Sequence, residues 1–481
     1  MKKKHLLYLI YFIVINSLCL SFLYSKNIFD NNENNIILEG FFWAYNNPEV
    51  QIVFKIAKDK NNILTGFVDF PDFNKKDIPI SRITYINNYF HIKIDEISLK
   101  YKGKLNKDST IITGKGKSEW NLLKKNDWKE LKFTLTLNKV KKALGKYQPQ
   151  TPLKPYIFNE EEVFFRNEKA GITFAASLTT PKTEGPFPVV IIISGGGSTD
   201  RNSKSHRHYP FLVIADYLAR NGIAVLRVDD RGIGGSTGES DYHEYTPIDR
   251  KGDVIASINF LKKHKKINPN KIGLLGFSEG GYVASLVAAE FKDSAFVIMY
   301  GSPGLDGTKT VLLQIESKSR VKGVDEKKIS RLNTEYAKGF ELLKKEKDDE
   351  KAKILTRKFF KRLGLSKNQT EKIIKDSINP WFRSLITWEP KKYISQIKCP
   401  VLAMIGELDI SVPPIHLKSI EEALKSGGNN NYKIIELAKH GHTFNRIETP
   451  EEQLTQNTWY IKETVSQVFL ETITKWILEN I

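Results

Sequence analysis

The sequence predicts two folded parts, a small antiparallel β domain and, after it, an α/β domain in which helices cover both faces of a parallel sheet. Between about residues 36 and 137, apolar and polar residues alternate with period two. From residue 161 onward, continuous apolar runs alternate with helical patterns. The length of 481 residues, with 40% hydrophobic and 27% charged residues, suits two or three domains with sizeable cores.

The first segment has the pattern of an export signal. Three lysines follow Met1, and an apolar run then extends from Leu6 to about Leu23. We therefore expect residues 1–25 to be a signal peptide and the mature protein to be periplasmic or secreted. A retained membrane anchor is the alternative, because the run is almost long enough to span a bilayer. Once Cys19 is removed with the signal, Cys399 is the only thiol, so no internal disulfide can form.

The β domain is predicted over residues 27–146 and contains no evident site. Its alternation is clearest from Val50 to Ile56. Residues 147–160 begin with a stretch that contains three prolines, which is typical of a linker. The two domains are therefore expected to fold as separate units.

The α/β domain is predicted over residues 161–481. A hairpin at 161–166 and 172–177 comes first, and helices are expected at 211–220 and 253–264. Continuous apolar runs predict buried strands at 188–193, 223–228, 272–277, 295–300, 400–405 and 432–437. Between about 302 and 395 this alternation stops, and a basic, helical pattern replaces it. An insertion of this size is too long for a loop, so we expect a helical cap over the carboxyl edge of the sheet.

A glycine-flanked serine marks the sharpest turn of this domain. Gly276-Phe277-Ser278-Glu279-Gly280 lies between a buried strand and a small-residue helix. The pattern Gly-x-Ser-x-Gly also occurs in ordinary turns. Its flanking strand and helix, however, are the context of a nucleophile elbow, where glycines are needed because strand and helix approach closely. Ser278 is therefore the candidate nucleophile.

The acid of a catalytic triad is expected after a late strand. A serine hydroxyl needs a base to take its proton and an acid to orient that base. In the hydrolases with a nucleophile elbow the chain order is serine, acid, histidine. Asp409 follows the strand that ends at Ile405 and is the preferred acid, with Glu407 as the competing candidate.

Three histidines downstream of Asp409 are candidates for the base. His416 falls in the first turn of a predicted helix and points away from the strand ends. His440 and His442 both follow the last strand, where a loop can fold back over the elbow. We favour His442 because the preceding Gly441 lets the loop aim the ring.

Acyl transfer also needs N–H donors for the oxyanion. One is expected to be the backbone amide of Glu279, which follows the nucleophile. The other is expected from the loop Ser194-Gly195-Gly196-Gly197, with Gly196 as the chosen donor; the alternative is that this loop is only a flexible turn. No metal and no cofactor is implied by these residues.

From residue 161 to the end, the chain resembles the exported bacterial α/β-hydrolase esterases of the EstD type, a group also labelled serine aminopeptidase-like hydrolases. The stretches that carry the resemblance are 194–201, 208–216, 225–236, 276–281, 399–409 and 441–445. It implies the α/β-hydrolase fold with a β-rich module ahead of it, and it supports His442 as the base. Phe277 replaces the usual histidine, and Gly196 and Ser198 replace the usual serine and proline. These departures affect the acyl pocket and the donor loop. The loop at 229–232 is interpreted as a brace for the elbow.

The expected function is that of a serine carboxylesterase acting on a small-molecule or lipid-like acyl ester. Trp381, Phe382 and Phe277 are the candidates for an apolar substrate pocket, although aromatic residues spaced like the two in the cap more often belong to the core of the cap. The same triad can cleave amides and thioesters, so a serine peptidase or an acyl thioesterase is the first alternative. A non-catalytic protein that binds envelope polymers or lipid is the second.

The net charge of +19 raises the possibility of an anionic partner. The lysines are scattered over strands and helices, and no nucleic-acid-binding motif is recognisable, so we expect no nucleic acid. A weak association with anionic membrane surfaces, screened by salt, is the more modest expectation.

Overall fold

A computed structural model describes most of the chain in two compact units, one within residues 18–147 and one from residue 148 to the end. The described residues are 35–44, 47–58, 63–70, 75–86, 88–106, 111–117, 131–138, 150–205, 208–362, 366–454 and 463–481. The predicted signal peptide and the first residues of the predicted linker lie outside them. Within the described ranges, no helix combines the length and the apolar character needed to cross a membrane.

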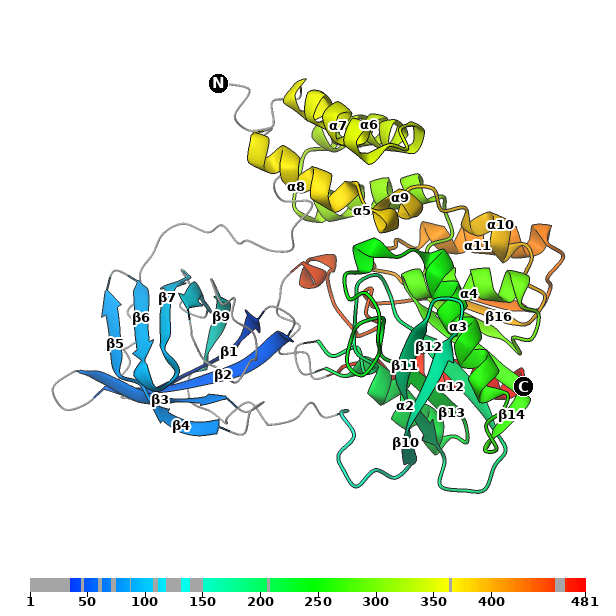
Figure 1. Ribbon diagram of the computed structural model, residues 1–481, viewed down its shortest axis with the longest axis horizontal. Coiled ribbons are helices and arrows are strands. Elements are labelled where there is room, and N and C mark those ends of the chain that lie inside the picture. Colours follow the sequence, from blue (N-terminus) through cyan, green and yellow to red (C-terminus); the bar gives the residue numbers. More distant parts are fainter. Residues whose placement is uncertain are drawn as a thin grey trace. The chain divides into compact units, whose positions relative to one another are not determined.

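The N-terminal unit is one antiparallel sheet of nine strands in the order β4-β3-β2-β1-β9-β8-β7-β6-β5 (Figure 1). Its strands are β1 (Asn35–Ala44), β2 (Asn47–Lys58), β3 (Leu64–Phe70), β4 (Lys75–Pro79), β5 (Arg82–Ile86), β6 (Tyr89–Ile94), β7 (Leu99–Leu105), β8 (Ile111–Lys117) and β9 (Leu131–Asn138). Alternate residues such as Phe54, Ile92 and Ile112 are buried in one cluster. The period-two pattern therefore places one face of the sheet around a core and the other face outside.

The second unit contains a sheet of eight strands in the order β10-β11-β13-β12-β14-β15-β16-β17. The strands are β10 (Asn159–Asn167), β11 (Ile172–Thr180), β12 (Phe187–Ile193), β13 (Ala224–Val228), β14 (Ile267–Phe277), β15 (Val297–Tyr300), β16 (Val401–Gly406) and β17 (Tyr432–Leu437). The pair β10–β11 is antiparallel, β11 is antiparallel to β13, and the remaining neighbours are parallel.

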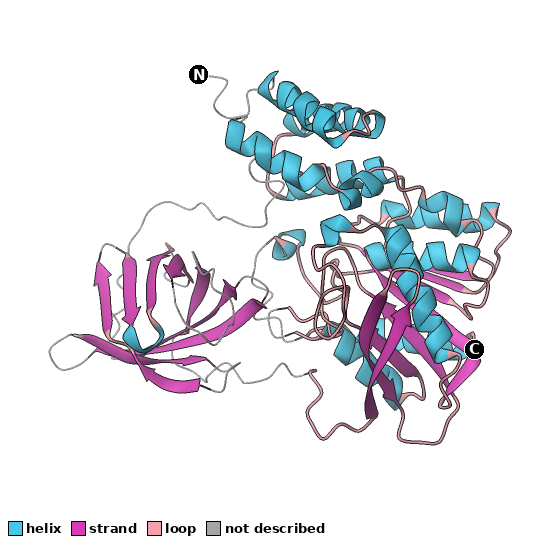
Figure 2. Ribbon diagram, viewed as in Figure 1, coloured by secondary structure: helices cyan, strands magenta, loops and turns pink. Residues whose placement is uncertain are grey.

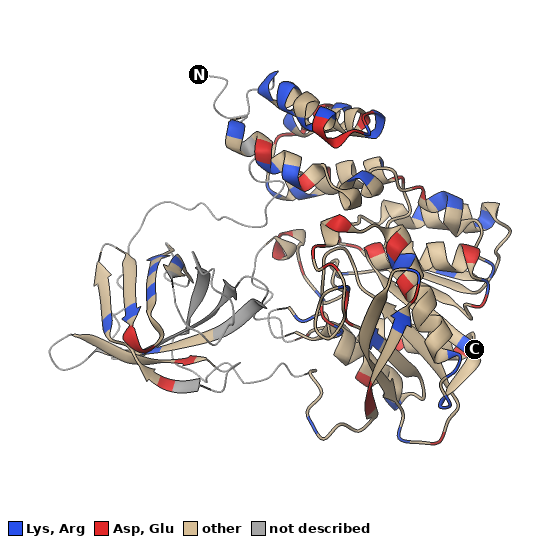
Figure 3. Ribbon diagram, viewed as in Figure 1, with Lys and Arg blue, Asp and Glu red and all other residues tan. Residues whose placement is uncertain are grey.

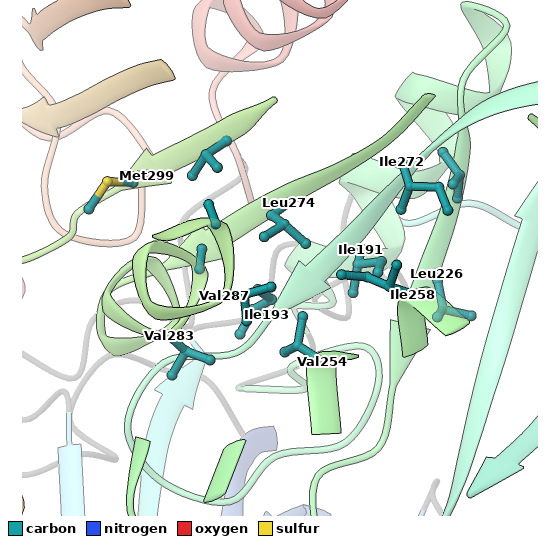
Figure 4. Packing of buried hydrophobic residues seen from close by; sticks show 14 of the residues in the cluster. Ile191, Ile193, Leu226, Val254, Ile258, Ile272, Leu274, Val283, Val287 and Met299 are labelled. Atoms are coloured by element: carbon teal, nitrogen blue, oxygen red, sulfur yellow. The ribbon is translucent and has the colours of Figure 1, made fainter. Parts of the chain in front are cut away.

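Helices cover both faces of this sheet, as Figure 2 shows. The helices that pack on it are α2 (Pro210–Arg220), α3 (Pro247–Leu261), α4 (Glu279–Glu290), α10 (Pro390–Ile394), α11 (Ile415–Ser426) and α12 (Gln467–Glu479). Apolar residues of α3, α4, α10 and α11 meet one face, including Val254, Ile258 and Val283 against Ile191 and Leu274 (Figure 4). Residues of α2 and α12 meet the other face. Burial on both faces explains why the strands are continuous apolar runs.

A helical insertion separates β15 from β16. It contains α5 (Gly307–Val321), α6 (Glu326–Lys345), α7 (Asp349–Arg362), α8 (Lys367–Ser377) and α9 (Pro380–Leu385), and it has an apolar core of its own that includes Ile315, Phe340 and Ile374. The predicted fold class is confirmed: an α/β-hydrolase fold with a helical cap, preceded by a small antiparallel all-β domain.

Candidate active site

Ser278 occupies the turn between β14 and α4, in a backbone conformation that its neighbours impose. Its φ and ψ are 52° and −120°, which a residue with a side chain rarely adopts. A Cβ atom at Gly276 would lie 2.4 Å from the carbonyl oxygen of Gly280, and one at Gly280 would lie 2.2 Å from that of Ile193. The two glycines are therefore required by close packing, and the turn presents Ser278 at the carboxyl end of the sheet.

Asp409 lies three residues after β16 and is fixed by its own loop. Its Oδ1 accepts the backbone N–H groups of Ser411 at 2.7 Å and Val412 at 2.8 Å. Its Oδ2 is thereby directed at Nδ1 of His442, which lies 2.7 Å away. The carboxylate is buried, so its interaction with the imidazole is weakly screened by solvent.

His442 bridges the acid and the serine. Its Nε2 lies 3.2 Å from Oγ of Ser278. Because Nδ1 donates its hydrogen to Asp409, Nε2 is left as the acceptor for the serine hydroxyl. The loop after β17 is held in place by Gln453, whose Oε1 accepts the backbone N–H of His442 at 3.0 Å. The structure thus brings together the three side chains that were predicted from distant segments.

The competing acid Glu407 and the competing histidine His440 form hydrogen bonds with groups outside the triad. Glu407 accepts the N–H of Lys439 at 2.9 Å. His440 contacts the carbonyl oxygen of Ala438 and the hydroxyl of Ser466, both at 2.7 Å.

His416 is buried at the start of α11, where its Nδ1 accepts the amides of Gly304 and Leu305 at 3.1 and 3.2 Å. Burial lowers the pKa of His416 to about 4, so its ring is neutral at physiological pH. It therefore serves as a fixed acceptor at the root of the cap.

The glycine loop after β12 lies beside the elbow. A Cβ atom at Gly195 would be 3.3 Å from Cβ of Ser278, and one at Gly196 would be 3.1 Å from Oε2 of Glu279. A side chain at either position would therefore crowd the elbow, and its neighbours would have to shift by a few tenths of an ångström. The N–H of Glu279 is the first of α4 and has no acceptor within the helix. Of the two predicted donor positions, Glu279 thus follows Ser278 directly, and Gly196 lies beside the side chain of Glu279.

Arg250 of α3 holds this loop in place through hydrogen bonds to its carbonyl groups. The local sequence around Arg250 does not predict this role. Its guanidinium donates to the carbonyl oxygens of Ser194 at 2.8 Å and Gly195 at 3.0 Å, and to Oε1 of Glu279 at 2.9 Å. The second carboxylate oxygen of Glu279 accepts the indole N–H of Trp381 at 2.7 Å. One buried carboxylate therefore connects the donor loop, the elbow and the cap.

The segment after β13 supports the same loop. Asp230 accepts the hydroxyl of Ser194 at 2.8 Å and the N–H of Thr199 at 2.9 Å. Burial raises the pKa of Asp230 to about 6, and the nearby Arg250 opposes that rise. Asp229 pairs with Arg201 at 2.7 Å. The loop at 229–232 is thus hydrogen-bonded to the glycine loop, as expected of a brace for the elbow.

Two of the three predicted pocket residues line a cavity of about 450 Å³ in the cap. They are Trp381 and Phe382, and the other apolar walls include Phe340, Phe359 and Phe360. The volume and the aromatic lining are those of a small-molecule pocket. Phe277 is not part of that lining; its ring packs against His442, with centroids 5.0 Å apart.

Within the described ranges, no cluster of three or more His, Cys, Asp or Glu side chains is arranged to hold a metal ion.

A family model described as X-Pro dipeptidyl-peptidase (S15 family) matches residues 170–414. The match begins at the β10–β11 hairpin and includes Ser278 and Asp409.

Among curated proteins, the chain is similar to esterase EstD of Thermotoga maritima. The two are 23% identical over 195 residues, which is 37% of this chain and 43% of the esterase, so less than half of that relative is spanned. An uncharacterised 31.7 kDa protein from the traX-finO intergenic region of Escherichia coli is 24% identical over 255 residues, which is 52% of this chain and 84% of that protein.

Solved structures with a similar arrangement include an esterase of Pyrococcus furiosus, at 18% identity and a TM-score of 0.41, covering 71% of this chain and 96% of that one. Another is Est1E of Butyrivibrio proteoclasticus, at 18% identity and a TM-score of 0.40, covering 66% and 98%.

Proposed function

The chain belongs to the X-Pro dipeptidyl-peptidase (S15) family, and from that premise we propose that it is a serine carboxylic ester hydrolase that works through an acyl-enzyme. It is a hydrolase of the α/β-hydrolase fold. The observation that carries the proposal is the continuous contact from Ser278 Oγ to His442 at 3.2 Å and from His442 to Asp409 at 2.7 Å.

The proposed reaction follows from this geometry. Ser278 attacks the ester carbonyl while Nε2 of His442 takes its proton, and Asp409 stabilises the imidazolium that forms. The negative charge on the carbonyl oxygen is met by the amides of Glu279 and Gly196. His442 then gives the proton to the departing alcohol. A water molecule repeats the sequence and releases the acid and the free serine.

The cap cavity supports an ester with an apolar acyl group as substrate. Trp381 lies at one wall of the cavity and also beside the glycine loop, because a Cβ atom at Gly196 would be 3.7 Å from its ring. An acyl group bound at Ser278 and directed past Trp381 would bury its apolar surface among Phe340, Phe360 and Phe382.

A peptidase is the second candidate function, because the description of the matched family names one. An acyl thioesterase shares the same chemistry. Values of kcat/KM for a p-nitrophenyl acyl ester, an acyl thioester and an Xaa-Pro p-nitroanilide, measured on one preparation, discriminate the three. The ester proposal expects the first value to be the highest, and a highest value for the anilide would replace it with the peptidase.

The first test asks whether Ser278 is activated at all. A fluorophosphonate probe should label the wild-type chain and leave Ser278→Ala unlabelled, and this variant should lose ester hydrolysis by a factor of about 10⁴ or more. Ser426→Ala in α11 is the matched control and should behave as the wild type. A wild-type chain that the probe does not label would favour a non-catalytic binding protein.

A further inference from the structure

The outer face of the N-terminal sheet places cations opposite cations. Strand register sets Arg82 opposite Lys93, Lys93 opposite Lys100, and Lys102 opposite Lys115. All of these side chains are exposed, as is that of Lys104. We call the six residues Arg82, Lys93, Lys100, Lys102, Lys104 and Lys115 the basic face. They come from four adjacent strands, β5 to β8, three of which, β5, β6 and β7, carry blue segments in Figure 3.

Folding of this domain does not require such an arrangement. Like charges directly opposite one another destabilise a strand pair. Acidic partners occur in the same sheet: on the outer side of β2, Lys55 pairs with Asp69 at 2.7 Å and with Asp77 at 2.8 Å. On the basic face, Lys93 pairs with Asp95 at 2.6 Å. Cations that lie opposite one another across a strand pair repel each other. An anionic partner at this face would offset that repulsion.

Apolar groups lie at the edge of the same face. The ammonium groups of Lys102 and Lys104 lie 5.0 and 5.5 Å from the ring centroid of Tyr89. Tyr89 is opposite Ile86 in the register, and the side chain of Ile86 is 60% exposed. A cationic surface flanked by an exposed aliphatic and an aromatic side chain matches the region between lipid headgroups and acyl chains, where cations and aromatic rings are both stabilised.

We propose that the basic face docks on the surface of a bilayer that contains anionic phospholipid. The cations are spread over one sheet face, so that several can approach a planar layer of phosphates together. Docking through this domain would hold the chain at a membrane without any contact from the hydrolase unit.

The test uses the full chain with vesicles of phosphatidylcholine alone and with vesicles that contain about 30% phosphatidylglycerol. We expect cosedimentation to be stronger with the anionic vesicles and to weaken steeply with salt. The difference between the two vesicle types separates the effect of charge from any contribution of the apolar N-terminal segment. The triple variant K100Q/K102Q/K115Q should lose roughly 100-fold in the charge-dependent affinity, taking each lysine as about fivefold.

The matched control is K265Q/K292Q/K418Q, which removes the same charge from exposed positions of the hydrolase unit. It should keep most of the affinity. Both triple variants should retain hydrolysis of a soluble ester, which shows that the hydrolase unit is folded, and a far-ultraviolet circular dichroism spectrum equal to that of the wild type shows that the N-terminal sheet of K100Q/K102Q/K115Q is folded too. Equal loss of affinity in the two variants would overturn the proposal, because binding would then follow net charge alone. Stronger binding to duplex DNA than to anionic vesicles at the same salt would also overturn it.

Discussion

The two carboxylate oxygens of Asp409 have different roles. Oδ1 accepts the amides of Ser411 and Val412 and thereby fixes the carboxylate, and Oδ2 faces Nδ1 of His442. Because the loop amides hold one oxygen, the carboxylate cannot rotate away when the imidazole becomes charged. Position and charge can consequently be separated by a substitution that keeps the shape and removes the negative charge.

Asp409→Asn makes that separation. Its Oδ1 can still accept the two loop amides, but its NH₂ group now faces His442 and favours the tautomer with hydrogen on Nε2, which cannot accept the proton of Ser278. We expect kcat for a p-nitrophenyl ester to fall by about 10⁴, the effect that the same change has in a chymotrypsin-like triad, with little change in melting temperature. Glu407→Gln is the control and should lower kcat less than about threefold; an equal loss in both variants would contradict the assignment of the acid.

At the scale of the elements, the elbow, the glycine loop and the cap meet at Glu279. Its carboxylate pairs with Arg250 at 2.9 Å and accepts the indole N–H of Trp381 at 2.7 Å, and all three groups come from different elements. Arg250 also holds the carbonyl oxygens of Ser194 and Gly195. Because a peptide N–H points opposite to its C=O, the bonds of these carbonyls to Arg250 turn the following amides of Gly195 and Gly196 away from Arg250. Glu279 is thus a positioning residue through its side chain.

Glu279→Gln should therefore lower kcat by roughly 10- to 100-fold, because Arg250 would be left as a buried charge with one fewer anionic partner and the loop would lose its alignment. KM should change much less, because the amide oxygen of glutamine can still accept the indole N–H of Trp381 at the wall of the cap cavity. Steady-state kinetics on the p-nitrophenyl ester measure both. The control is Glu290→Gln at the end of α4, where the carboxylate pairs with Lys251 at an exposed position. A loss confined to KM would show that Glu279 acts on binding instead.

The elements themselves were predictable where local pattern decides them. The strands of the α/β sheet are continuous apolar runs because both faces are covered, and the elbow is visible because glycine must flank Ser278. Arg250 could not be found in the same way. It lies in an amphipathic helix, and only the packing of α3 against β12 and α4 turns its side chain toward Ser194 and Glu279. From the sequence alone, a buried arginine in a helix cannot be distinguished from an exposed one; the difference appears only when the position of the helix in the fold is known.

At the scale of the whole molecule, the sequence also does not show which charged residues come together in the fold. The lysines of the basic face are separated by up to 22 positions, from Lys93 to Lys115, and along the chain they look scattered. Strand register alone sets Lys102 opposite Lys115. The net charge of +19 was therefore evident from composition, whereas the gathering of the six cations of the basic face required the pairing of distant strands.

The stability of the hydrolase unit should depend on pH through His416. Burial lowers the pKa of this ring to about 4, whereas the unfolded chain has the ordinary value near 6.5. Between these two values the unfolded state binds more protons than the native state. The free energy of unfolding therefore rises with pH across this window, and it falls as the pH is lowered from about 6.5 toward 4, by up to about 3 kcal/mol.

His416→Asn tests this linkage, because an asparagine oxygen can replace Nδ1 as acceptor for the amides of Gly304 and Leu305 but does not titrate. Urea titrations at about pH 7.5, 6.0 and 5.0 should show a smaller fall in the free energy of unfolding for the variant than for the wild type, so that the two curves converge on acidification. His91→Asn, at an exposed position of β6, is the control for loss of an imidazole. Parallel curves for the wild type and His416→Asn would mean that the ring at the root of the cap does not resist protonation and that its burial contributes no pH dependence to the stability of the hydrolase unit.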